Sequence, residues 1–473
     1  MQACWLHTRA MIIMMVIAGC SPTTQPESHL GESPAFKSIM KHTDDNTRKS
    51  EEGSIVSDQP SKSGVVDVPI IPRPLTLDAA LDLARGFNPA LRAKRRELDI
   101  AEGELKQASI YFQHNPEVSF GIGGRVITAP QQNETFAEPE IEISQEFEIW
   151  GQPSARRKAA EAARSATIAD ILAAEWEILA QLRHRFYTTQ LASQRVKLAE
   201  NQASFADTVL RLSRRQLEAG EISRTDYRQL EIRSARLKTN LLTARAAFKS
   251  SISNLRALIG LSPAEKIEIP DELPPLVDPS HTSDVLINEV LEHHPRLRHA
   301  EFIAEQRRYE LTLEHAEAKP NVTGGFFWEQ EEIHSNKYGI NLSFPLPLFN
   351  RGQGSIAASQ SALEKAKAEI RSVGYTLRNE TKIAVNNYII GYEAASFYRN
   401  EVIPAIQANL EQLENAFRLG EIGSIELRVD QRELIEAQIA ALETLSDTYQ
   451  YRAAIEGLLG RGLEASRRRT KIP

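Results

Sequence analysis

The sequence predicts a mixed α/β chain made of two copies of one unit, each with long helices and one pair of strands. Three observations carry this prediction. Two segments alternate apolar and polar residues, as strands with two different faces do. A stretch from 154 to 262 contains no proline and repeats apolar residues at coiled-coil spacing. Strands, helices and turns then recur in the same order about 200 residues later, which indicates a duplication.

The composition excludes some classes of protein. The chain has 473 residues, of which 25% are charged and 41% hydrophobic, within the range of globular proteins. Its formal net charge of −7 argues against a dedicated nucleic-acid binder, so we expect no nucleic-acid partner. Beyond residue 20, no apolar run approaches the ~20 residues that a transmembrane helix requires. Strands, whose hydropathy signal is weaker, would have to make any membrane crossing.

The first residues predict a secretory signal peptide, 1–19. Arg9 precedes an apolar run, and small residues lead to Cys20. The segment I-A-G-C that ends at Cys20 resembles the bacterial lipobox, which implies cleavage before Cys20, its lipidation and a periplasm-facing anchor. Ser21 after the cysteine favours the outer membrane in that pattern. An ordinary signal peptide with a chance cysteine is the alternative. The other cysteine, Cys4, lies in the segment that would be removed, so no disulfide is expected.

Residues 20–74 are predicted to form an N-terminal tether. This segment is rich in Ser, Pro, Thr, Asp and Lys, and it cannot bury enough apolar surface to fold alone. It ends at Pro72-Arg73-Pro74, a sequence that disfavours helix. Thr76 has the residue type of a helix N-cap and precedes an apolar stripe, so the first repeat is placed at 75–262.

The first strand hairpin is predicted at about 115–149. From Glu140 to Ile149, glutamates and one serine alternate with Ile, Gln and Phe, which gives a polar and an apolar face. Upstream, Val118, Phe120 and Ile122 alternate with polar or small residues in the same way. Each strand has about the ~9–11 residues that a tilted membrane strand needs.

Two long helices joined by a tight turn are predicted between Pro153 and Pro263. Gly220 and Gly260 are the only glycines in this segment, and Gly220 would form the turn, the first tip, at about 219–225. A helix from 153 to 218 would be about 100 Å long at about 1.5 Å per residue. A compact cytosolic enzyme needs no helix of that length, whereas a tube across the periplasm does.

A linker at 263–282 leads to the second repeat, predicted at 283–462 and followed by a tail at 463–473. Its hairpin is expected at about 320–348 and its tip at about 419–425. Gly220-Glu221-Ile222 recurs as Gly420-Glu421-Ile422, and Leu258-Ile259-Gly260 recurs as Leu458-Leu459-Gly460, both 200 positions later. Pro404 lies within the first long helix of this repeat and is expected to kink it.

This order of lipobox, helix pair, hairpin, very long helix, G-E-I turn and long helix resembles the TolC-type outer membrane factor family over residues 75–462. The resemblance implies a homotrimer in the outer membrane. Each subunit would give four strands to a shared 12-stranded β-barrel and its long antiparallel coiled-coil helices to a trimeric α-barrel across the periplasm. Physical chemistry agrees, because hairpins with open edges cannot cross lipid and must close a barrel with other copies.

The segment from Pro345 to Gly354, P-L-P-L-F-N-R-G-Q-G, resembles the strand-to-helix junction of the heavy-metal cation (cobalt-zinc-cadmium type) RND efflux subgroup. The resemblance implies a passive exit duct of a tripartite efflux system, with a periplasmic adaptor (a membrane fusion protein) and an inner-membrane RND pump as partners. One alternative is a duct for drug or solvent efflux or for type I protein secretion. Another is a lipid-anchored coiled-coil protein without a pore, which would leave the two hairpins unexplained.

The resemblance assigns the two turns to adaptor binding. The tip residues are Gly220, Glu221, Ile222, Gly420, Glu421 and Ile422. Alternatively the glycines serve only as helix C-caps, and the two roles are compatible.

Acidic residues that follow the turns are the candidate periplasmic gate, because acidic rings narrow the closed entrance in relatives and favour cations. These residues are Asp226, Glu426 and Asp430. Glu426 matches the family's gate position, but the next acidic position falls on Val429, one residue before Asp430. As solvated helix charges, the three acids would need no role.

The glutamates of the second strand would line the lumen of the barrel if the isoleucines face lipid, and we then expect a cation-favouring channel. These are Glu140, Glu142, Glu146 and Glu148. No paired-carboxylate, Ser/His or phosphate-loop pattern stands where it could catalyse, and no His or Cys spacing completes a metal site. We therefore expect no enzyme activity, no cofactor and no bound metal.

Overall fold

The structure is a computed structural model, and it describes residues 71–129, 132–279, 283–332, 335–418 and 424–463. All of these belong to one of the two units into which the chain divides, Pro69–Pro473. The predicted signal peptide, Cys20, nearly all of the tether, and the second tip with Gly420, Glu421 and Ile422 lie outside the described residues.

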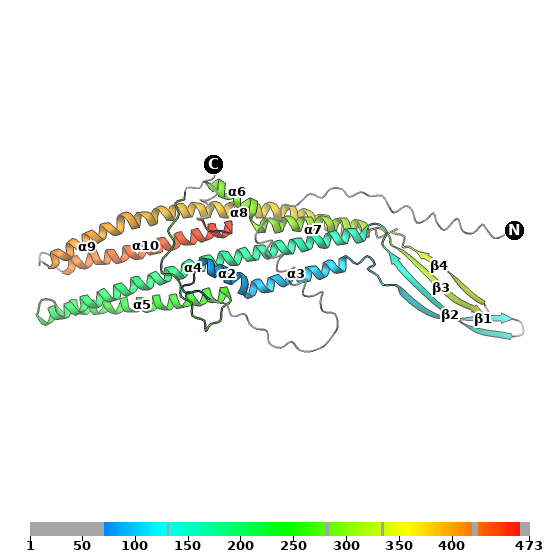
Figure 1. The fold of residues 1–473 in the computed structure, drawn as a ribbon, viewed down its shortest axis with the longest axis horizontal. Coiled ribbons are helices and arrows are strands. Elements are labelled where there is room, and N and C mark those ends of the chain that lie inside the picture. Colours follow the sequence, from blue (N-terminus) through cyan, green and yellow to red (C-terminus); the bar gives the residue numbers. More distant parts are fainter. Residues whose placement is uncertain (1–70, 130–131, 280–282, 333–334, 419–423, 464–473) are drawn as a thin grey trace. The chain divides into compact units, whose positions relative to one another are not determined.

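The described elements follow the same order twice, which confirms the predicted duplicated α/β fold (Figure 1). The first copy contains α2 (Leu77–Phe87), α3 (Pro89–Ala108), β1 (Glu117–Ala129), β2 (Gln132–Phe147), α4 (Gln152–Glu218) and α5 (Arg224–Ile259). The second copy contains α6 (Ser283–His293), α7 (Pro295–Glu317), β3 (Val322–Glu332), β4 (Ser335–Ser343), α8 (Gln353–Phe397), the π-helix Tyr398–Val402, α9 (Ile403–Arg418) and α10 (Ser424–Leu459).

Side-chain caps begin α2 in the first copy and the corresponding helices α3 and α7 in the two copies. Thr76 accepts a hydrogen bond from the backbone N–H of Ala79 at 3.3 Å, as its residue type predicted. Asn88 caps α3 through its side-chain oxygen, and His294 caps α7 through Nδ1. A proline follows Asn88 and His294 as the first helical residue of α3 and α7, where its missing N–H leaves no bond unmade.

The four strands form one antiparallel sheet in the order β1-β2-β3-β4. Phe120 pairs with Ile141, Ile141 with Trp328, and Trp328 with Tyr338, so apolar residues of all four strands share one face. The glutamates that alternate with Ile141 share the opposite face. β1 and β4 are the outer strands, and each has one edge with no strand against it in the described chain.

The hairpin of the second copy is shorter than predicted. β4 ends at Ser343, whereas the alternation of apolar residues continues through Leu346. Pro345 and Pro347 explain the difference, since proline has no N–H to donate to a neighbouring strand. In the first copy, where no proline stands at the corresponding place, β2 runs to Phe147.

The core lies where α4 and α10 pack together, and it joins both copies. α4 contacts α2, α3, α5, α7 and α10, and α7 lies between α4 and α8. Leu182, Phe186 and Leu255 are buried there with residues of α2 and α10. Within the described chain, every helix is too short or too polar to span a membrane.

The linker between the copies is held against the helices by buried polar groups. Arg452 and Glu456 of α10, 3% and 1% exposed, form an ion pair of 2.9 Å. The hydroxyl of Tyr187 donates to Glu456 at 3.1 Å, and Arg452 donates to the carbonyl of Pro275 at 2.7 Å. Tyr388 donates to the carbonyl of Val277 at 2.6 Å. Gln190 of α4 donates to the linker carbonyls of Pro270 and Glu272 at 3.1 and 2.9 Å, so helices of both copies bond to the same linker.

A π-helical turn stands directly before Pro404, the residue at which a kink was expected. The N–H of Ile403 bonds to the carbonyl of Tyr398, five residues earlier, and α9 continues from there. A proline that cannot donate to the preceding turn favours such a local change of hydrogen bonding.

Candidate functional site

The first tip is a compact helix-ending turn. Gly220 has a φ of +78°, and the N–H of Glu221 bonds to the carbonyl of Gln216 at 2.9 Å. This six-to-one bond across a left-handed residue is the Schellman motif, which satisfies the last carbonyls of α4. A Cβ at position 220 would meet no atom within 4 Å, so the glycine is required by the backbone rather than by crowding. Glu221 is exposed beside it and Ile222 is half-buried.

Asp226 takes part in the N-terminal cap of α5. The hydroxyl of Ser223 accepts from the N–H of Asp226 at 3.1 Å and donates to its carboxylate at 2.7 Å. A carboxylate in the first turn also suits the positive end of the helix dipole. Asp226 therefore has a local structural role, and its gate role stays a prediction. Glu426 and Asp430 belong to α10, but the structure describes only their backbone and not their side chains.

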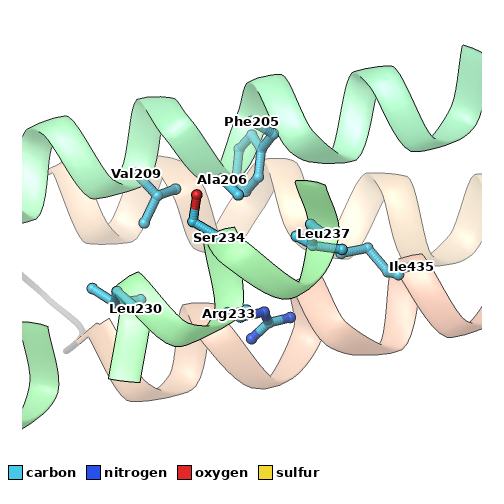
Figure 2. A pocket seen from close by; sticks show the side chains of 8 residues that line it. All are labelled: Phe205, Ala206, Val209, Leu230, Arg233, Ser234, Leu237 and Ile435. Atoms are coloured by element: carbon cyan, nitrogen blue, oxygen red, sulfur yellow. The ribbon is translucent and has the colours of Figure 1, made fainter. Parts of the chain in front are cut away.

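A small apolar hollow lies near this end of the coiled coil, between α4 and α5. It is lined by Phe205, Ala206, Val209, Leu230, Arg233, Ser234, Leu237 and Ile435. Figure 2 shows Ile435, from α10, beside Leu237 of α5. Ser234 donates to the carboxylate of Asp207 at 3.0 Å and ties α5 to α4 there. The two coiled coils therefore approach each other at this level.

Three of the four predicted lumen glutamates share the polar face of the sheet. Glu140, Glu142 and Glu146 lie on β2, and the register sets Glu140 directly opposite Glu329 of β3. Glu142 accepts from the side-chain amide of Asn341 at 3.2 Å, and Glu146 from that of Asn321 at 2.7 Å. Their alternation with Ile141 and Ile143 predicted this shared face, and the role of lining a lumen stays a prediction.

Glu148 differs from these three. It follows the end of β2, and its carboxylate forms an ion pair with Arg156 of α4. The side chains of Glu148 and Arg156 are 10% and 18% exposed, so this pair is largely withdrawn from solvent. The alternation of polar and apolar residues did not predict this difference, because it continues beyond the last residue of β2.

The sequence argument did not include two residues that complete the polar face. Glu329 and Lys337 form an ion pair of 3.1 Å between β3 and β4, and the Lys337 ammonium lies 5.9 Å from the Phe327 ring centre. Each of these two residues stands alone in its strand and belongs to no alternating pattern in the sequence. Only the pairing register of the strands shows that they share a face with the glutamates of β2. Among the described residues, no three His, Cys, Asp or Glu side chains are placed to hold a metal ion.

Comparison with known protein families agrees with this architecture. The family described as outer membrane efflux protein matches residues 80–261 and 286–461, one range for each copy. Together the two ranges cover well over half of the chain. The chain belongs to the outer membrane efflux protein family. As an outer membrane efflux protein, it is not an enzyme.

One curated relative and several solved structures resemble this efflux protein. The cobalt-zinc-cadmium resistance protein CzcC of Cupriavidus metallidurans is 29% identical over 406 residues, which are 85% of this chain and 94% of CzcC. The outer-membrane channel OprN superposes with a TM-score of 0.70 at 17% identity, over 82% of this chain and 90% of OprN. VceC of Vibrio cholerae gives 0.67 at 18% identity, over 82% and 96%. At these identities the two structures show a shared fold.

Proposed function

We propose that three copies of this chain form an outer membrane channel that serves as the passive exit duct of a tripartite efflux system for heavy-metal cations. An inner-membrane RND pump would supply the cations, and a periplasmic adaptor would dock at the tips around Gly220 and Gly420. A lipid on Cys20 would add an anchor in the outer membrane.

The exposed apolar face of the sheet is the observation that carries the membrane part of this proposal. Ile122 is 83% exposed and Ile340 is 84% exposed, although both lie in the middle of strands. A soluble protein rarely exposes a contiguous apolar patch of this kind. Lipid would cover this face, while the two open sheet edges would need strands from further copies.

The polar face and the relative CzcC support a cationic substrate. Glu140 and Glu142 would face the lumen if the apolar face meets lipid, and carboxylates along a pore raise the local concentration of cations. The relative with 29% identity is named for cobalt, zinc and cadmium resistance. Its match covers 85% of this chain and therefore most of the proposed duct.

Deleting the gene and measuring growth tests this function. We expect lower minimum inhibitory concentrations of cobalt, zinc or cadmium salts, restored by the wild-type gene on a plasmid. Dyes and antibiotics are assayed in the same strains. Unchanged metal tolerance together with increased drug sensitivity would contradict the metal substrate and favour a drug duct.

A further inference from the structure

Because the chain is duplicated, each position in the first hairpin corresponds to a position in the second at a fixed offset in the sequence. Phe120 pairs with Ile141 in the first hairpin, and Gly324 pairs with Leu342 in the second. These two pairing registers fix the sum of the β1-to-β3 offset and the β2-to-β4 offset at 405 residues. The junctions after the hairpins fix one of them, because Gly151 and Gly352 both have positive φ and are 201 residues apart. The offset from β2 to β4 is therefore 201 residues, and the offset from β1 to β3 is 204.

Within one chain, the structure shows how the first hairpin meets the second. Ile143 of β2 pairs with Phe326 of β3, and Ile141 with Trp328. At the end of the sheet next to the helices, called its foot below, the side-chain amide of Gln152 donates to Asn321 at 2.8 Å. The Gln152 side chain is almost fully buried.

The second hairpin has corresponding groups along its outer edge, and no strand of the described residues lies against them. Gln353 repeats the local geometry of Gln152, since each side-chain oxygen accepts, at 2.8 Å, the N–H of the residue two positions earlier. Gln353 is nevertheless exposed, whereas Gln152 is buried. Phe344 corresponds to Ile143, and the two are similarly exposed, at 54% and 51%, because both lie on the apolar face of the sheet.

We propose that β4 of one subunit pairs with β1 of the next in the register that the β2–β3 contact sets within the chain. Applying the two offsets places Phe344 opposite the neighbouring subunit's Ile122, and Leu342 opposite the neighbour's Gly124. This register rests on the proposed trimer and specifies how its subunits join. The occupant of both open edges is thus a second copy of this chain.

The residues that would meet at the foot of this contact are chemically complementary. Asn321, which accepts from Gln152, corresponds to Glu117, a carboxylate that can accept from Gln353. Trp150 donates to the carbonyl of Pro320 at 2.9 Å. Trp150 corresponds to Arg351, a stronger donor, and Pro320 to Pro116, which offers the same carbonyl. The duplication has changed the side chains but kept a donor opposite an acceptor.

The helices show the same difference between the inner and outer joints. Leu442 of α10 packs against the buried core around α4. Its counterpart 200 positions earlier, Leu242 of α5, is 65% exposed. In the duplication α5 corresponds to α10, and α4 corresponds to α8. Since α10 packs on α4 of its own chain, α5 would pack against α8 of a neighbouring subunit.

Disulfide cross-linking of the full chain tests the register. Residues directly opposite in antiparallel strands lie about 4.5–5.5 Å apart at Cα, within disulfide range, whereas a shift by two residues adds about 6.8 Å along the strand. The pair Ile122→Cys with Phe344→Cys should give covalent dimers and trimers on non-reducing gels. Within one chain these positions are three strand spacings apart across the sheet, about 14 Å, and further apart along the strands, so they cannot bond. The shifted pair Phe120→Cys with Phe344→Cys should stay monomeric.

A matched control is Ile143→Cys with Phe326→Cys, the corresponding pair inside the chain, which should close a disulfide without covalent oligomers. Single-cysteine variants account for the native cysteines. Two outcomes would show that the register is wrong although the trimer stands, provided that the control disulfide closes. In the first, Phe344→Cys bonds to Phe120→Cys or Gly124→Cys. In the second, Phe344→Cys bonds to none of Phe120→Cys, Ile122→Cys and Gly124→Cys. If native mass spectrometry of the wild-type protein shows no trimer, the proposed duct fails with it.

Substitution of Glu117 tests the end of the contact near the helices without disulfides. Glu117→Leu removes the oxygen that would accept from Gln353 and should lower the temperature at which the trimer dissociates in detergent. Glu117→Gln keeps a side-chain oxygen that can accept and should preserve most of that stability. Equal effects of the two variants, or no effect of Glu117→Leu, would contradict the contact.

Discussion

His294 occupies in the second copy the capping position that Asn88 occupies in the first. Its Nδ1 accepts the N–H of Arg296 at 3.2 Å, and its ring meets the Trp176 ring edge-on at 5.2 Å between centres. Burial, with a smaller effect from the positive charge of Arg296, lowers the pKa of His294 to about 4. The neutral ring is the form that can accept the capping bond.

This histidine should make stability depend on pH. A histidine in the unfolded chain has a pKa of about 6.5. Below that pH the unfolded chain therefore binds a proton at this position, whereas His294 in the folded chain stays neutral until the pH approaches its lowered pKa. The stabilisation is complete above pH 6.5, and up to about 3 kcal/mol is lost as the pH falls towards 4. His294→Asn keeps a capping oxygen but does not titrate.

Thermal unfolding in detergent at several pH values measures this effect. The wild-type protein should lose more stability than His294→Asn between pH 6.5 and 4.5. Equal pH dependence in the two proteins would show that His294 is not held neutral.

At the residue scale, the sequence predicted backbone roles better than side-chain partners. Thr76 and Gly220 were identifiable because caps and left-handed turns restrict the residue type locally. The burial of Gln152 depends on Asn321, 169 residues away, and no local pattern contains that distance.

Among the elements, the linker between the copies is more firmly fixed than its proline-rich sequence suggests. Its carbonyls at Pro275 and Val277 accept bonds from Arg452 and Tyr388. Burial raises the pKa of Tyr388 to about 12, so its hydroxyl remains a donor at physiological pH. The linker therefore acts as a structural part of the core between α4, α8 and α10.

Removing one partner of the buried pair should be costly. Glu456→Ala would leave the Arg452 guanidinium buried without its carboxylate and should destabilise the fold by about 3–5 kcal/mol. Replacing both Arg452 and Glu456 by leucine should cost less than the sum of the single changes.

The exposed pair Arg157–Glu161 provides the control, and Glu161→Ala should change stability by less than about 0.5 kcal/mol. Denaturant unfolding of these three variants beside the wild-type protein gives the comparison. Equal effects of Glu456→Ala and Glu161→Ala would contradict a stabilising role for the buried pair.

Periodicity predicted the type and order of the elements, because apolar alternation and coiled-coil spacing extend over many residues. It did not predict where elements end. β4 stops before Pro345 because proline cannot donate, and Glu148 leaves the sheet face because Arg156 of the next helix pairs with it. Such ends depend on single residues and on their partners.

For the whole molecule, the two faces of the sheet predict ion selectivity. Replacing Glu140 and Glu142 together with glutamine removes two charges per subunit from the proposed lumen while preserving size. Cation over anion permeability, from reversal potentials in planar bilayers, should fall towards unity.

Glu97→Gln, at an exposed position of α3 paired with Lys94, is the control and should leave the reversal potential unchanged. Anion preference in the wild-type channel, or an unchanged potential in the double variant, would show that these carboxylates do not set selectivity.

The two arms of the duplicated unit differ by one residue in length. From Gly151 to Gly220 the first arm is one residue longer than the second from Gly352 to Gly420, and only the second contains the π-helical turn. One residue of α-helix corresponds to about 1.5 Å of axial length and about 100° of rotational phase. Six tips in a trimer would then form two classes of three, out of phase with each other. In the proposed assembly, an adaptor that recognises one class would meet the other with a different side presented, so threefold occupancy should saturate before sixfold occupancy begins.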